Sequence, residues 1–105
     1  MDKILNKYIT NNTEITFKKI KPFYNICPIT EMKEEVNVEI IYKPDKYLLE
    51  IGSYREYFNK KFNCYIEELA QMVYNEIQKT IYPKELVVRV YLDEEKLTPW
   101  IVKIQ

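Results

Sequence analysis

The stretch that decides the fold is YIEELAQMVYNEIQKTI, residues 65–81. Its apolar side chains recur every three or four positions, at Ile66, Leu69, Ala70, Val73, Ile77 and Ile81. That spacing is typical of a helix that buries one face. Pro83 follows almost at once and favours an end to the helix near residue 81. We therefore expect a helix over about residues 65–81, whose apolar face needs a second layer to pack against.

Strands are predicted on both sides of this helix. Upstream, residues 35–42 alternate between apolar and polar side chains, which indicates a half-buried strand. A short turn containing Pro44 leads to residues 47–51, which we expect to pair back as a hairpin. Downstream, residues 85–92 alternate in the same way and lead through a turn to a last strand over 97–104.

The first quarter of the chain carries weaker signals. Residues 1–12 are interpreted as a loose or short helical lead-in, and residues 13–21 as a β-prone stretch. Between Pro22 and Pro28, residues 23–27 should be extended but interrupted, because proline cannot donate to a sheet ladder.

A short second helix is expected before the long one. Ser53 is predicted as its N-cap, Glu56 completes a capping box, and the helix runs through Phe58. The resulting order is strand, strand, helix, helix, strand, strand. It predicts an α+β fold in one domain over residues 1–105, with a four-stranded antiparallel sheet and both helices on one face.

The other face of that sheet is left bare. Ile41, Val87 and Trp100 are expected to lie on it, beside unpaired edge strands. Apolar surface of this kind usually marks assembly. We therefore expect a homo-oligomer in which several subunits join their sheets into a barrel.

Composition excludes several classes of function. A single glycine leaves no room for a glycine-rich phosphate loop. No histidine is present, and two cysteines without CxxC spacing do not make a zinc site, so no metal is expected. The same two cysteines do not form a disulfide framework, and no apolar run or leader predicts a membrane or secreted protein, so the cytoplasm is expected.

The formal net charge is +0, from 16 basic and 16 acidic residues. Binding to a nucleic acid would therefore need a local basic patch. Two short runs are candidates, Lys18, Lys19 and Lys21 in one and Lys60 and Lys61 in the other. Either run alone is more typical of a solvated surface.

Four short motifs occur in a recognisable order. They are Cys27-Pro28-Ile29-Thr30 with Glu34 seven residues after the cysteine, Tyr42-Lys43-Pro44-Asp45-Lys46, Leu49 to Phe58, and Tyr65-Ile66-Glu67-Glu68; Thr98-Pro99 follows near the end. Together they resemble the QueF family of NADPH-dependent 7-cyano-7-deazaguanine reductases, from about Phe17 to the C-terminus. The resemblance implies the tunnelling fold, the same ββααββ order, and rings of subunits such as a pentamer or a pair of pentamers.

The positions that depart from the reductase pattern indicate which branch of the family the chain resembles. Gly52 and Arg55 stand where the reductases have lysines, and Trp100 begins a segment where they have Arg-Gly-Gly. Those parts are tied to NADPH, so no nicotinamide cofactor is expected. Their absence is similar to the QueF-like amidinotransferases, which convert the nitrile of 7-cyano-7-deazaguanine in tRNA to the amidine of archaeosine with ammonia. Glu34 replaces the family aspartate, and Ile66 replaces its histidine.

The resemblance also implies roles for particular residues. Cys27 would attack the nitrile carbon to give a thioimidate, and Glu34 would carry the proton, with Glu31 and Glu35 as rivals. Glu67 would anchor the guanine-like edge of the base. The substrate-binding set is Leu49, Glu50, Ile51, Ile66 and Glu67.

Other interpretations of these residues stay open. Without the motif, Cys27 is typical of a small buried hydrophobe, and Glu67 of a solvated acid in a first helical turn. Two other functions remain as alternatives. One is a catalytically weakened relative that binds a deazaguanine or purine base, and the other is a nitrile reductase acting on the free base.

Overall fold

The computed structural model of the chain describes residues 1–10, 12–18, 23–92 and 100–105. Within these ranges the elements are β1 (Lys3–Leu5), β2 (Ile15–Lys18), β3 (Phe23–Ile26), β4 (Lys33–Lys43), β5 (Tyr47–Leu49), α1 (Ile51–Tyr57), β6 (Lys61–Phe62), α2 (Ile66–Ile81), β7 (Glu85–Leu92) and β8 (Trp100–Ile104). The predicted α+β class and the two helices are confirmed. The turn expected at residues 93–96 and the residues 97–99 lie outside the described ranges.

The main sheet is larger and less regular than expected. Its strands follow the order β6-β3-β4-β7-β8, and β2 pairs with another part of the long strand β4. All of these pairs are antiparallel except β3 with β6, which are parallel. The prediction of four antiparallel strands in the order ββααββ is therefore wrong in strand number and in the parallel pair. The sheet is mixed because β6, at its edge, pairs in parallel with β3.

The expected hairpin between residues 35–42 and 47–51 is also wrong. β5 pairs with β1 in a separate two-stranded sheet, with Leu5 opposite Tyr47 and Lys3 opposite Leu49. The lead-in at residues 1–12 thus contains a strand, and Ile51 begins α1 instead of ending a strand. A three-residue strand has too few positions to show a period, so neither partner could be read from its pattern.

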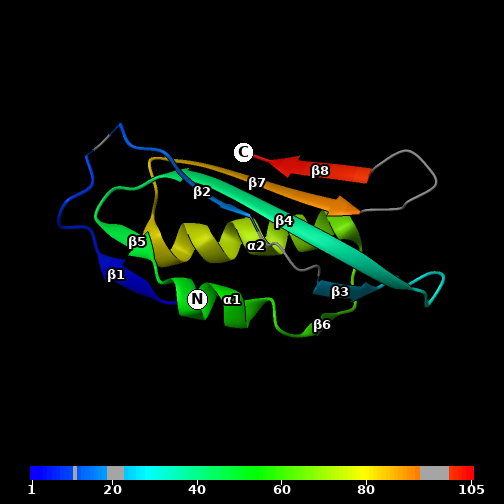
Figure 1. Cartoon of the computed structure of the whole chain (residues 1–105). Helices are drawn as coiled ribbons and strands as arrows, with labels where there is room; N and C mark the ends of the chain where they lie inside the picture. The colour runs from blue at the N-terminus through cyan, green and yellow to red at the C-terminus, as the bar shows by residue number, and fades with distance from the viewer. Residues whose placement is uncertain (11, 19–22, 93–99) are drawn as a thin grey trace.

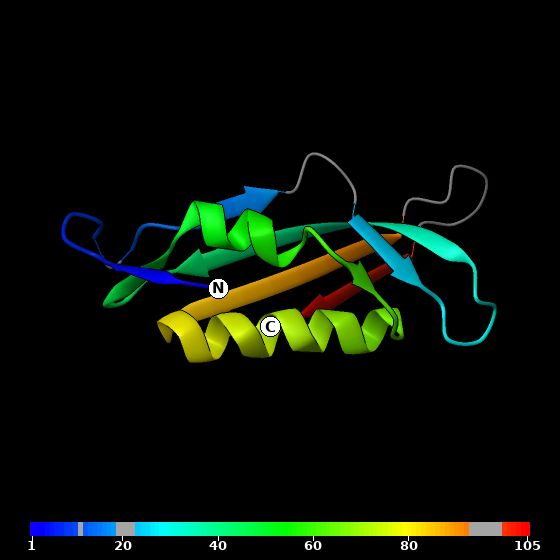
Figure 2. The same cartoon turned by 90° about the horizontal axis from the view of Figure 1, so that it is seen from below.

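One core joins the sheet to both helices. Figure 2 shows α1 and α2 side by side under one face of the sheet, as predicted. The predicted face of β4 is fully buried, with Val36, Val38, Ile40 and Tyr42 each at 1% exposure or less. The predicted apolar face of α2 belongs to the same core and packs mainly against β7, and Leu69, Val73 and Ile77 are each 0% exposed.

The other face of the sheet carries a mixture of charge and apolar surface. Ile41 pairs with Val87 there, and both side chains are half-buried. The side chain of Trp100, also expected on this face, lies outside the described part of the structure. Within the described residues, no helix is long and apolar enough to cross a membrane. The barrel of joined sheets remains a prediction.

Candidate functional site

Cys27 follows β3 directly and opens the tight turn that leads into β4. Its N–H donates to the carbonyl oxygen of Met32 at 3.0 Å, and its carbonyl oxygen accepts from the N–H of Glu31 at 2.9 Å. Glu31 has a φ of 59°, in the left-handed region that costs a side chain some strain. The turn therefore holds Cys27 at a fixed position at one end of the molecule.

The turn also sets the chemistry of the thiol. Hydrogen bonds from the Thr30 side chain, and then from the N–H groups of Thr30 and Ile29, lower the pKa of Cys27 below its ordinary value. Partial burial and the negative charge of Glu34 act in the opposite direction but are outweighed. Because the thiolate is the nucleophile, a lower pKa increases the reactive fraction at neutral pH. No histidine is needed for this activation.

A hollow of about 380 Å³ opens beside the thiol. It is lined by Cys27, Thr30, Met32, Lys33, Glu34, Glu35 and Leu92. Of the three acids considered as the proton carrier, Glu34 and Glu35 share this hollow with Cys27, while Glu31 is not among its lining residues. Glu34 is the half-buried one of the pair. Lys33 supplies a cation, with its Nζ 3.8 Å from the centre of the Tyr24 ring.

Sequence reasoning missed Asn25. Its side chain is 0% exposed and bonds both the Glu34 carboxylate and the backbone of Cys64. A lone polar residue in a short apolar strand between two prolines has no periodicity, and only the expectation that buried polar groups are paired would have singled it out.

The start of α2 lies near the Asn25 side chain. Cys64, which Asn25 holds, is three residues before Glu67, and Glu67 is exposed in the first helical turn. Ile66, at the family's histidine position, is only 5% exposed and belongs to the core. Burial raises the pKa of Cys64 above its ordinary value, helped by the charges of Glu68 and Glu34, so this thiol is the less reactive of the two.

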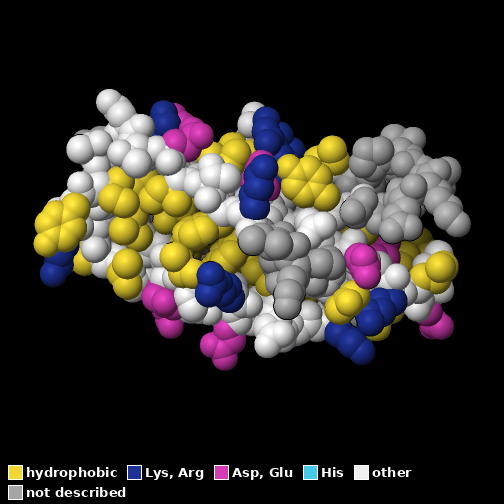
Figure 3. All heavy atoms as spheres, in the orientation of Figure 1, with side chains coloured by type: hydrophobic (Ala, Val, Ile, Leu, Met, Phe, Trp, Pro, Cys, Tyr) yellow, Lys and Arg dark blue, Asp and Glu magenta, His cyan; other side chains and the backbone are white. Residues whose placement is uncertain are grey.

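The remaining predicted binding residues lie elsewhere in the subunit. Leu49, Glu50 and Ile51 line a separate hollow of about 310 Å³ together with Ile4, Ile15, Phe17, Tyr42 and Leu48. Figure 1 shows β1 and β5 at one end of the molecule and β3 at the opposite end, and Figure 2 agrees. Hydrophobic side chains gather over the β1–β5 end (Figure 3). A single chain therefore does not bring these three residues to Cys27.

Glu50 has a structural role in this subunit. As the N-cap of α1, its carboxylate accepts from the N–H of Gly52 at 2.9 Å and of Ser53 at 2.6 Å. These bonds lower the pKa of Glu50. The prediction of Ser53 as the N-cap is wrong, because the N-cap is Glu50, three residues earlier. A Cβ at Gly52 would lie 3.1 Å from Oε1 of Glu50, so the glycine leaves room for the carboxylate to fold over the helix start.

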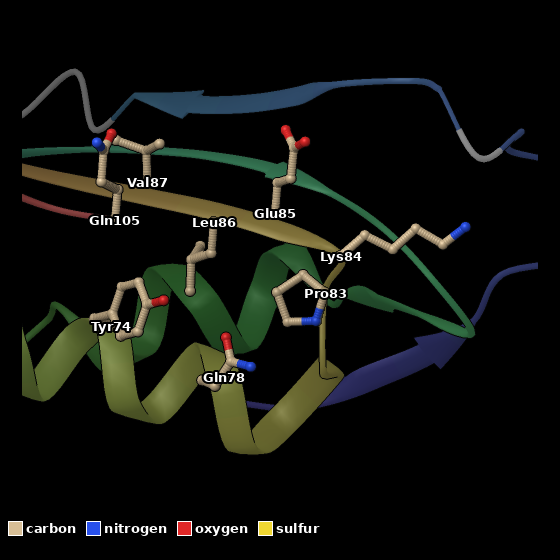
Figure 4. A pocket seen from close by; sticks show the side chains of 8 residues that line it. All are labelled: Tyr74, Gln78, Pro83, Lys84, Glu85, Leu86, Val87 and Gln105. Atoms are coloured by element: carbon tan, nitrogen blue, oxygen red, sulfur yellow. The ribbon is translucent and has the colours of Figure 1, made fainter.

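A further hollow of about 360 Å³ lies between the end of α2 and the start of β7. Figure 4 shows Leu86 directed towards α2 beside Tyr74, while Lys84 and Glu85 point away. None of the predicted site residues lines it. Among the residues that the structure describes, no cluster of Cys, Asp or Glu side chains could hold a metal ion.

Known proteins provide an independent comparison. No family model matches the sequence. The chain is 36% identical over 69 residues to an NADPH-dependent 7-cyano-7-deazaguanine reductase of Aquifex aeolicus, across 66% of this chain and 50% of the relative. It is 27% identical over 78 residues to the reductase of the same name from Chlorobium phaeobacteroides, across 71% of this chain and 67% of the relative. The chain thus spans half the length of the first relative.

The fold agrees with these likenesses. A crystal structure of the archaeosine synthase QueF-Like in the apo form superposes with a TM-score of 0.74 over 90% of this chain and 95% of that chain, at 16% identity. At that identity the superposition shows a shared fold and nothing finer. The sequence relatives and the shared fold together therefore confirm the predicted resemblance of the chain to the QueF/QueF-like (T-fold) family.

Proposed function

We propose that the chain uses Cys27 to attack the nitrile of a 7-cyano-7-deazaguanine base carried in tRNA, and that ammonia then converts the adduct to the amidine of archaeosine. The observation that carries the proposal is the Cys27 turn. It provides a thiol of lowered pKa and a half-buried acid, Glu34, in one hollow. A nitrile needs both a nucleophile at carbon and a proton at nitrogen.

The proposed reaction has two steps. First, the sulfur of Cys27 bonds to the nitrile carbon, and Glu34 takes the thiol proton and delivers it to the nitrile nitrogen, which gives a neutral thioimidate. Second, ammonia adds to the same carbon and the sulfur leaves with a proton, which gives the amidine and the free thiol. Neither step oxidises or reduces the substrate, so no nicotinamide is required.

Glu67 is proposed as the anchor of the base. Its exposed carboxylate in the first turn of α2 can accept two N–H bonds from one planar edge, which is a directional contact. Ile66, whose side chain is in the core, contributes to the pocket by its backbone position and packing.

Two copies are proposed to form each complete site. The Cys27 turn exposes Ile29 at 75% and Met32 at 68%, and the opposite end exposes Leu5 at 59% and Ile51 at 48%. A head-to-tail contact between two different apolar ends closes into a ring when the rotation allows. Such a ring would bring Leu49, Glu50 and Ile51 of one copy to Cys27 of the next. A strict monomer by light scattering at micromolar concentration would contradict it.

Incubation with free 7-cyano-7-deazaguanine, followed by mass spectrometry, tests the chemistry. A covalent gain on Cys27 that is lost in Cys27→Ala and kept in Cys64→Ala is expected. Turnover that survives in Cys27→Ala would end the proposal. If wild type binds the base without any adduct, the weakened binding relative is the better description.

A reductase acting on the free base is the second candidate. It is favoured by the two sequence relatives, which are both named as NADPH-dependent reductases. Oxidation of NADPH that depends on added base would support it. The amidinotransferase proposal instead expects no NADPH oxidation and an amidine product when ammonia and nitrile-bearing tRNA are supplied.

A further inference from the structure

Every hydrogen-bonding position of the buried Asn25 amide is used. Its Nδ2 donates to Oε1 of Glu34 at 2.9 Å and to the carbonyl oxygen of Cys64 at 2.9 Å. Its Oδ1 accepts from the N–H of Cys64 at 3.2 Å and lies 3.7 Å from the Sγ of Cys64. One amide supplies two donor hydrogens and one acceptor oxygen, so this set saturates it.

The partners also fix which way the amide points. A flipped amide would set its oxygen against the Cys64 carbonyl and the Glu34 carboxylate, and its NH₂ against the Cys64 N–H. Three attractive contacts would become repulsive, and a buried polar group without a partner is costly. Asn25 therefore presents a donor to Glu34 in any folded subunit.

We infer that Asn25 is the positioning residue for the proton carrier Glu34, an inference that rests on the proposed function. Because the Nδ2 donor occupies Oε1, that oxygen stays an acceptor. Oε2 is then the oxygen left to receive the thiol proton and to deliver it. Asn25 acts through Glu34 and does not touch the substrate.

The same amide joins the three segments that carry the site. Asn25 lies on β3 two residues before Cys27, Glu34 lies on β4, and Cys64 precedes the helix that carries Glu67. The double contact with the Cys64 backbone extends the two-residue parallel pairing of β3 and β6. The orientation of the acid is thereby tied to the position of the proposed base anchor.

Two variants separate the contacts of Asn25. Asn25→Ser is too short to reach Glu34 and Cys64 together. Asn25→Asp keeps the shape and the acceptor for the Cys64 N–H, but it turns a carboxylate oxygen towards Glu34. Asn63→Ser makes the same exchange at an exposed residue next to Cys64 and serves as the control. Circular dichroism checks that each variant is folded, and Asn25→Asp preserves the test if Asn25→Ser does not fold.

The first measurement is the rate of Cys27 adduct formation with free 7-cyano-7-deazaguanine. Both Asn25 variants should lose at least tenfold in rate while the affinity for the base changes less than twofold. Adding Glu34→Gln to either variant should slow adduct formation little further, because the two residues act as one unit. In the wild type the same substitution should slow adduct formation clearly. Additive losses, or an unchanged rate in both Asn25 variants, would overturn the inference.

The second measurement does not depend on nitrile chemistry. Alkylation of Cys27 by iodoacetamide is followed against pH, with Lys33 and Glu35, the other charged groups of the hollow, left unchanged. Since the Glu34 charge raises the thiol pKa, Glu34→Gln should move the profile to lower pH in the wild type and move it less in Asn25→Ser. Equal shifts in the two backgrounds would refute positioning. A wild type that forms no adduct would refute the proposed function, but the alkylation measurement would still test whether Asn25 positions Glu34.

Discussion

Arg89 and Glu39 form an ion pair on the face of the sheet that the helices leave open. Nη1 of Arg89 donates to Oε1 of Glu39 at 2.8 Å, and Nζ of Lys18 lies 3.2 Å from Oε2. Burial works to raise the pKa of Glu39, but the hydrogen bonds and charges of Lys18 and Arg89 outweigh it and hold that pKa below its ordinary value. The open face therefore carries a carboxylate that is ionised at neutral pH in the folded state.

This pair predicts a pH-dependent loss of stability. A carboxyl group whose folded pKa is depressed stabilises the fold above its unfolded pKa and loses that contribution as pH falls through the folded value. Arg89→Met should lower the Tm at pH 7, and the loss should be smaller at an acidic pH below the folded pKa of Glu39, where the carboxyl group is protonated. Lys103→Met, an exposed neighbour on β8, is the control. An equal loss at both pH values would show that packing, not charge, is responsible.

The two thiols are predicted to react at very different rates. The pKa of Cys27 is lowered by Thr30 and that of Cys64 is raised by burial, so iodoacetamide at about pH 7.5 should modify Cys27 at least ~10-fold faster. Thr30→Val, which removes the largest lowering contact, should slow Cys27 alone. Peptide mass spectrometry at timed intervals separates the two sites. Faster labelling of Cys64 would contradict the electrostatic assignment.

The long helix predicts a large difference between its two sides. Leu69 is 0% exposed, and Leu69→Ala should reduce the free energy of unfolding by about 2–5 kcal/mol. Met72 is 45% exposed on the same helix, and Met72→Ala should change it by less than about 0.5 kcal/mol. Urea denaturation compares the two. A similar effect at both positions would mean that Met72 is covered in solution, as it would be in a subunit contact.

The start of α1 gives a separate prediction. Glu50→Ala removes the carboxylate that accepts from Gly52 and Ser53, so the Tm should fall by several degrees. Glu56→Ala, on the exposed side of the same helix, should leave the Tm unchanged within error. If the Glu50 variant instead keeps its Tm and loses base affinity, the carboxylate belongs to the binding site of the assembled protein.

The second lysine run is the better candidate for contact with tRNA. Nζ of Lys60 lies 4.7 Å from the Tyr57 ring centre and 5.0 Å from that of Phe62, and Lys61 is exposed, whereas Lys18 is already paired with Glu39. Lys60→Glu with Lys61→Glu should weaken tRNA binding and flatten its dependence on salt by about 0.7–0.9 in log–log slope per lost phosphate contact. Lys46→Glu, exposed in the turn before β5, is the control. An unchanged slope would remove this run from the interface.

The elements that the sequence predicted correctly are those in which the apolar pattern repeats several times. The helix over residues 65–81 and the strands around Val38 and Val88 repeat their pattern often enough to be recognised. β1 and β6 have three and two residues, so their existence depends on the partner strand and not on local pattern. Glu50 was missed as a cap because Ser, Thr, Asp and Asn are the preferred N-caps, and Ser53 offered one nearby.

The candidate site also contains residues that a local motif indicates and residues that only the three-dimensional packing reveals. Cys27 and Glu34 were proposed from a short motif, because a turn of fixed spacing is a local property of the chain, and both residues line the same hollow. Asn25 could not be found like this, since its partners include a residue 39 positions away. The separation of Leu49, Glu50 and Ile51 from Cys27 was equally out of reach, because it depends on where β5 finds its partner strand.

The Cys27 turn is encoded within six consecutive residues. The backbone bonds that close it, and the Thr30 and Ile29 contacts that tune the thiol, all join positions 27–32. The contacts that lower the pKa of the thiol therefore all lie in one short segment, whereas the proposed direction of proton delivery depends on the packing of the whole sheet edge.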